Sequence, residues 1–266
     1  MKKSSFFAVA LATMFFAACG GNKTAQNTEE VSAEISFEQE QIEASIKQNF
    51  DSLATQVGKL KQLPIRKKDG VITLSEEEIK VKPDYLLDPS ISEEATTLAE
   101  KYRLLSALQI DKEIAELYEM PTTEYENGIA SLFVDINDPS FKAIEGNSDV
   151  YETTQELYNA MSENGRINYF WQIVSTALVE QLYVVSQNTD KFLAAFDDET
   201  ASNMSYRMIL IQDAINRLTE YDPEVTPVAE ALEPLTVINA TSVSELKEQL
   251  ESAKEQIAAA RQSLVG

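Results

Sequence analysis

The sequence predicts an all-α fold, a bundle of about six to eight helices. The 266 residues include only eight glycines and eight prolines, so few positions interrupt a helix. Apolar residues recur three and four positions apart over most of the chain, which is the spacing of one helix face. The stretch INYFWQIVSTALVEQLYVV (167–185) is apolar on all sides, which is typical of a helix at the centre of a bundle.

Prolines and capping residues place the expected helix boundaries. Pro64 ends the first helix, and Ser92, followed by two glutamates, is a favourable helix start. Asp197 and two further acids precede another helix in the same way. The expected helices span 34–62, 92–120, 122–136, 149–163, 167–188, 199–221, 225–239 and 242–264.

Residues 64–91 have a different pattern. A Lys-Asp-Gly turn signal, β-branched runs and further prolines predict an extended excursion, with a small hairpin between 71–74 and 79–82. We expect residues 34–266 to form a single helical domain that contains this excursion.

The last helix, 242–264, has the most regular apolar seam. The seam consists of Val243, Leu246, Leu250, Ala253, Ile257, Ala260 and Leu264. So narrow a seam suits a helix packed on the outside of a bundle, or a short coiled coil. We expect the helix to pair with 34–62, and it is also the predicted surface for a protein partner.

Two of the expected helices resemble each other. The segment YRLLS (102–106) is similar to WQIVS (171–175), and both helices later reach a Leu-Tyr pair. Helices 92–120 and 167–188 are therefore either an internal duplication or two helices that meet similar packing demands.

Composition excludes several functions. The net charge is −22, which argues against nucleic acid as a partner, because phosphate binding depends on clustered Lys and Arg. Histidine is absent, so neither a Ser-His-Asp triad nor a His-ligated metal site is available. We expect no cofactor and no bound metal.

The first residues have the pattern of a secretory signal peptide. Lys2 and Lys3 are followed by an apolar run from Phe6 to Ala18 that is too short to span a bilayer. The small pair before Cys19, the only cysteine, resembles the lipobox of bacterial lipoprotein precursors, although Phe16 stands where that family usually has Leu.

That resemblance implies a cleavage site and a cellular location. Cleavage would follow Ala18, and Cys19 would become the first residue, carrying diacylglycerol on sulfur and a further acyl chain such as palmitate on nitrogen. Residues 19–33 would then be a flexible tether, since they lack large apolar side chains. Gly20 in place of Asp implies the outer membrane rather than the inner one, and leaves open a periplasmic or a surface location.

Glu180 is the most unusual residue of the mature chain, because it lies within the most apolar helix. A buried acid is expected to be paired with another group, to be protonated, or to line a functional cleft. Arg207 flanks the apolar stripe of helix 199–221, so we predict a buried Glu180–Arg207 pair with a structural role.

Other candidate sites are weaker. Residues 135–146 lack the Gly and Glu that a calcium-binding EF-hand loop needs, and the acids at 197–199 are explained by a helix start. The aromatic residues Tyr169, Trp171, Tyr183 and Tyr206 are expected in the core.

The sequence therefore favours a non-enzymatic binding or scaffold module, anchored as an envelope lipoprotein. One alternative is a carboxylate-dependent hydrolase acting on glycans or cell wall, since such enzymes need no histidine. The other is a subunit of a larger envelope assembly.

Overall fold

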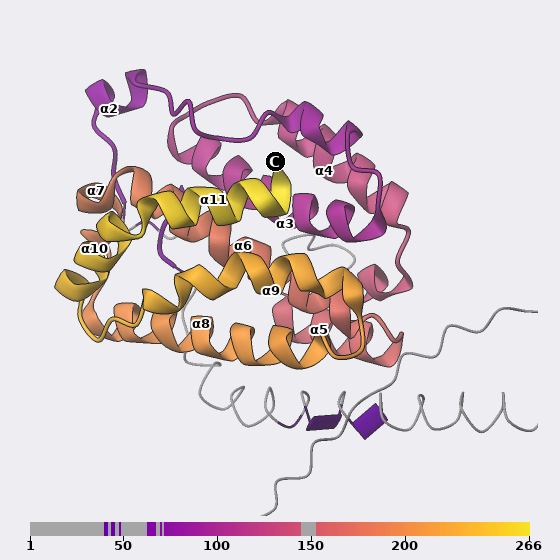
Figure 1. The fold of residues 1–266 in the computed structure, drawn as a ribbon. Coiled ribbons are helices and arrows are strands. Elements are labelled where there is room, and N and C mark those ends of the chain that lie inside the picture. The colour runs from indigo at the N-terminus through magenta and orange to yellow at the C-terminus, as the bar shows by residue number, and fades with distance from the viewer. Residues whose placement is uncertain are drawn as a thin grey trace, which may run out of the picture. The chain divides into compact units, whose positions relative to one another are not determined.

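The computed structural model describes residues 40–41, 44–45, 48, 63–67, 70, 72–144 and 153–266 (Figure 1). By its contacts the chain divides into the units Met1–Glu40 and Gln41–Gly266, and apart from Glu40 the described residues all belong to the second. The predicted signal peptide, Cys19, the tether and nearly all of helix 34–62 lie outside the described residues.

The all-α prediction is confirmed, and no strand occurs in the described part of the chain. The α-helices are α2 (Glu76–Lys80), α3 (Leu98–Leu117), α4 (Thr123–Ile136), α5 (Thr154–Glu163), α6 (Ile167–Gln187), α7 (Thr189–Leu193), α8 (Asp198–Leu218), α9 (Thr226–Leu232), α10 (Val243–Ser252) and α11 (Lys254–Val265). Short 3-10 helices are η2 (Pro89–Glu93), η3 (Pro139–Ile144), η4 (Pro223–Val225) and η5 (Glu233–Val237).

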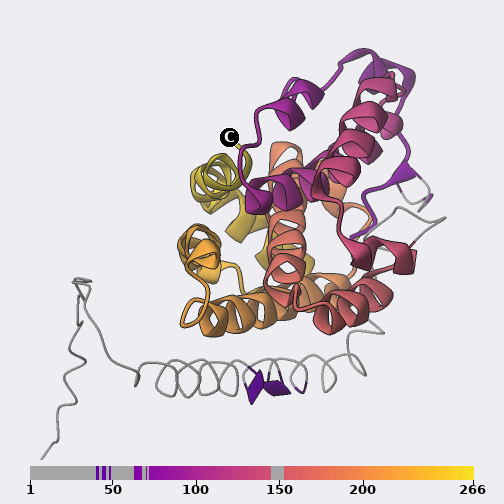
Figure 2. The ribbon, with the colours of Figure 1, turned by 90° about the vertical axis from the view of Figure 1, so that its right-hand side faces the viewer.

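Helix α6 is the centre of the bundle, as its sequence predicts. It contacts α3, α11, α5, α8, α7, α9 and α10. In Figure 2 it stands upright in the middle, with α8 crossing its lower end and α9 and α11 on one side. Its apolar residues fill the core around it. No helix among the described residues is both long and apolar enough to cross a membrane.

The predicted hairpin in 64–91 is wrong. Residues 72–75 form no strand, and α2 occupies the first half of the expected second strand. A capping box explains the difference. The side chain of Ser75 accepts from the amide of Glu78, and the Glu78 carboxylate accepts from the amide of Ser75 at 2.7 Å. Lys191 of α7 then holds this segment through the Thr73 carbonyl and Glu78.

Helix α3 begins later than predicted. Ser92 lies in η2, and α3 starts after Thr97, which forms a second capping box with Glu100. The side chain of Glu100 also accepts from the amide of Thr96. Two Ser/Thr-x-x-Glu patterns thus decide the starts of α2 and α3, which the turn signals and the cap at Ser92 placed wrongly.

The predicted helix 242–264 is two helices, α10 and α11, which meet at Ala253. Its apolar seam is buried from Leu246 to Leu264, and α11 packs on α6, α9 and α3. The seam is therefore used within the domain, and a protein partner at this helix would have to bind its exposed polar side. The expected contact with 34–62 lies outside the described residues.

Helix α5 ends in a Schellman motif at Gly165. The amide of Gly165 donates to Ser162 O at 3.2 Å, and that of Arg166 donates to Met161 O at 2.7 Å. Gly165 has φ +66, in the left-handed region that an alanine adopts only at a cost of about 1 to 2 kcal/mol.

Replacing Gly165 with Ala should therefore lower the free energy of unfolding by about 1 to 2 kcal/mol. The position has no neighbour within 4 Å of an added Cβ, so the backbone alone carries the cost. Gly165→Asn should lower the free energy of unfolding by less, as measured by urea denaturation, because Asn tolerates this conformation better than Ala. Equal losses in the two variants would contradict this account.

Candidate functional site

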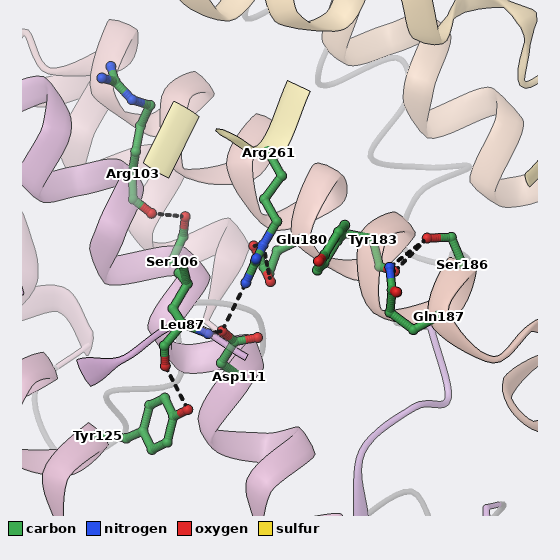
Figure 3. Close-up of polar contacts among 10 residues, drawn as sticks. All are labelled: Leu87, Arg103, Ser106, Asp111, Tyr125, Glu180, Tyr183, Ser186, Gln187 and Arg261. Carbon is green, nitrogen blue, oxygen red and sulfur yellow. Dashed lines mark hydrogen bonds and ion pairs between the residues drawn. The ribbon is translucent and has the colours of Figure 1, made fainter. Parts of the chain in front are cut away.

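Three charged side chains meet in the interior of the bundle, each from a different helix. Asp111 comes from α3, Glu180 from α6 and Arg261 from α11 (Figure 3). The Nε of Arg261 donates to both carboxylate oxygens of Glu180, at 2.9 and 2.8 Å. Its Nη2 lies 3.4 Å from Oδ2 of Asp111. We call these three residues the charge cluster.

The charge cluster is enclosed by protein. The side chains of Asp111 and Glu180 are 0% exposed, and that of Arg261 is 12% exposed. Burial of ionised groups is costly unless they are paired and hydrogen-bonded. Burial, followed by the charge of Glu180, raises the pKa of Asp111 well above its ordinary value.

A backbone segment closes one side of the cluster. The amide of Leu87 donates to Oδ2 of Asp111 at 2.7 Å, while the hydroxyl of Tyr125 on α4 donates to the carbonyl of Leu87 at 2.8 Å. The segment before η2 is therefore fixed to α3 and α4 at the same residue. Burial raises the pKa of the Tyr125 and Tyr85 hydroxyls, so both stay neutral.

Tyr183 covers the guanidinium from another side. The Cζ of Arg261 lies 4.1 Å from the centre of the Tyr183 ring, a cation–π geometry. Tyr85 packs edge-on against Tyr183, with ring centres 6.3 Å apart. Aromatic rings thus replace water around the cation, which strengthens its interaction with Glu180.

A second buried arginine lies nearer the start of α3. The Nε of Arg103 donates to Leu264 O at 2.9 Å, and Nη1 donates to Oε1 of Gln172 at 2.8 Å. The Leu264 carbonyl belongs to the last turn of α11, where an intrahelical donor is lacking. Arg103 therefore ties the end of α11 to α3 and α6.

The two polar contacts are in register along α3 and α6. Arg103 meets Gln172, 69 residues later, and Asp111 meets Glu180 at the same separation. Because both pairs keep one offset, the two helices run parallel. The similarity between them also extends beyond five residues, since YRLLSALQID aligns with WQIVSTALVE and places Asp111 opposite Glu180.

The predicted Glu180–Arg207 pair is replaced by another. The structure places Arg261 on Glu180, whereas Arg207 lies partly buried on α8. The prediction of a pair followed from the position of Glu180 within an apolar helix. Glu180 is indeed buried on α6. The cation comes from α11 and not from α8.

Asp111 and Arg261 were not singled out from the sequence. Asp111 follows a run from Leu104 to Ile110 that is apolar or small except for Gln109, and Glu180 has a similar setting in its own helix. Arg261 directly follows Ala260, a residue of the apolar seam of the last helix. The sequence therefore places Arg261 at the edge of the core. The ten-residue alignment of α3 with α6 is the sequence signal that places Asp111 opposite Glu180.

The weaker candidates have structural roles. Asp197 caps α8 by accepting from the amide of Thr200 at 2.8 Å. Asp138 accepts from the amide of Ser140 and from the hydroxyl of Tyr102. Tyr169, Trp171 and Tyr183 pack in or against the core, and Tyr206 is partly buried. In the described part of the chain no group of Asp, Glu or Cys is placed to hold a metal ion.

A pocket of about 200 Å³ lies between the start of α3 and the end of α11. Its lining includes Arg103, Glu100 and Glu94. Glu100 is engaged in capping α3, and Arg103 in holding Leu264 and Gln172. The pocket therefore offers a ligand few polar groups that the fold does not already use.

The chemistry of the charge cluster is that of an internal ion pair. A general acid or nucleophile must reach its substrate, and these carboxyl groups have no exposed surface. Comparison with protein-family models, with characterised proteins and with solved structures found no match to this chain.

Proposed function

We propose that the protein is a bacterial envelope lipoprotein, anchored through Cys19, whose helical domain is a non-enzymatic binding or scaffold module. The N-terminal pattern that ends in Ala17-Ala18-Cys19 supports the anchor. Several acyl chains on one residue would hold the chain stably on a membrane without a spanning helix.

The enclosed charge cluster is the observation that carries the non-enzymatic reading. Asp111 and Glu180 are a pair of acids that meet at one site, as a carboxylate-dependent hydrolase requires, yet both are buried against Arg261. A glycan must lie between the two carboxyl groups of such an enzyme. The cluster serves the packing of α3, α6 and α11 instead, and this supports a scaffold over the hydrolase.

The anchor is tested by metabolic labelling with an alkyne fatty acid in a bacterial host. The wild-type chain should take up label and sediment with membranes. Cys19→Ala should lose the label and leave the membrane fraction or remain an unprocessed precursor, because no other residue of the chain can form the thioether. Label retained by Cys19→Ala, or a mature chain that begins after residue 19, would overturn the anchor.

The module's role is tested separately in detergent-solubilised envelope. Wild type and Cys19→Ala carry the same domain, so a partner of the domain should be captured by both, and a partner of the lipid only by the first. Release of reducing sugar from purified cell wall by wild type, abolished in Asp111→Asn, would contradict a non-enzymatic module and favour the hydrolase.

A further inference from the structure

We propose that the charge cluster is a proton-binding site, in which Asp111 holds one proton at neutral pH and thereby allows α11 to dock on α3 and α6. The bound ligand is a single proton on a carboxyl group, shared by hydrogen bonding with Glu180. The site is independent of the proposed membrane anchor and of any activity.

The donors around the two carboxyl groups are unequally divided. Both oxygens of Glu180 accept from Nε of Arg261 at 2.8 to 2.9 Å, as an ionised carboxylate would. Asp111 receives only the Leu87 amide at 2.7 Å and the long 3.4 Å contact of Arg261, both at Oδ2. No N–H or O–H of the described residues reaches its Oδ1. Oδ1 is therefore the atom free to carry a hydrogen.

Both carboxyl groups lie against one guanidinium, at 2.8 and 3.4 Å, and the charge and hydrogen bonding of Glu180 raise the pKa of Asp111. Two ionised carboxylates are both acceptors and repel, so a bond between them needs one proton. With that proton the cluster contains one cation and one anion and is neutral. Without it, a net negative charge would lie at a fully buried position, which is strongly unfavourable.

The other side chains that the structure shows beside the cluster are tyrosines. From the segment before η2 it is faced by Tyr85 and the Leu87 amide, from α4 by Tyr125, and from α6 by Tyr183. Asp88 is an exposed acid near Tyr125. Burial and Glu180 both raise the pKa of Asp111, in agreement with the geometry.

The sign of the pH dependence follows. A carboxyl group whose pKa is raised on folding stabilises the fold most fully below its unfolded pKa, near 4, and this contribution is lost as pH rises through the folded value. Alkaline pH therefore adds charge at the point where α11 meets α3 and α6.

Infrared spectroscopy of the purified full chain tests the proton directly. At pH 7.5 exposed acids are ionised, because their pKa values lie near 4, so a carbonyl band of protonated carboxyl reports a buried acid. We expect that band in wild type and in the control Asp88→Asn, whose replaced residue is exposed at a helix cap. Asp111→Asn should lack it. No band in wild type, or a band that persists in Asp111→Asn, would overturn the proposal.

Thermal melting between pH 5 and pH 9 tests the consequence. Asn keeps an oxygen for the Leu87 amide and cannot ionise, so Asp111→Asn should show a flatter Tm profile than wild type and exceed it at pH 9. Asp88→Asn should keep the wild-type slope. Parallel profiles for wild type and Asp111→Asn would contradict a titrating Asp111.

Discussion

Replacing Arg261 with Met should lower the free energy of unfolding by about 3 to 5 kcal/mol, because it leaves a buried acid without its cation. Met preserves most of the volume of the aliphatic stem but donates no hydrogen bond to Glu180. The contact with the Tyr183 ring is lost as well. Urea denaturation at pH 7, followed by far-ultraviolet circular dichroism, measures the change.

Arg217→Met is the matched control. Arg217 of α8 pairs with Asp213 at 3.0 Å, and the two side chains are 46% and 48% exposed. Exposed pairs of this kind contribute about 0 to 1 kcal/mol. Adding Glu180→Met to Arg261→Met should recover much of the loss, since a buried pair is less costly to replace than to break. Equal effects of the two arginine variants would show that enclosure of the cluster does not matter.

Replacing Trp171 with Ala should lower the free energy of unfolding by about 3 to 5 kcal/mol through a cavity in the core. Trp171 is 1% exposed and packs against Phe170 with ring centres 5.4 Å apart. It lies on α6, which contacts most of the other helices, so little of its surroundings can move to fill the space. Chemical denaturation under the same conditions as above gives the value.

Trp171→Phe should lose clearly less, because the aromatic ring keeps most of the contacts. Val134→Ala on α4 serves as the surface control, since Val134 is 76% exposed and its change should fall within about 0.5 kcal/mol. A loss in Trp171→Ala no larger than in Val134→Ala would argue that α6 is not the rigid centre of the bundle.

Much of the helical fold could be predicted because apolar spacing and composition are local properties. The buried helix at 167–188 and the helix that ends at Asn137 lie where their patterns placed them. The predictions were wrong at helix boundaries, because a single capping side chain determines where a helix starts. The Ser75–Glu78 capping box made a helix of an expected strand, and Thr97 rather than Ser92 began α3.

The charge cluster could be predicted only in part. That Glu180 needs a partner follows from its apolar surroundings in sequence. Which arginine supplies it depends on how α6 and α11 are rotated and staggered against each other, and spacing within one helix carries no such information. The alignment of α3 with α6 is the one sequence signal that connects Asp111 to Glu180.

The order in which the charge cluster is assembled has a consequence for biogenesis. Asp111 and Arg261 are 150 residues apart in the chain, and at about 5 to 20 residues per second a ribosome needs roughly 8 to 30 s between them. Until α11 emerges, Asp111 and Glu180 lack the cation that pairs with them in the folded domain, and the apolar surfaces of α3 and α6 that α11 covers stay open. Completion of the core must therefore wait until Arg261 of α11 has been synthesised, however early α3 and α6 form.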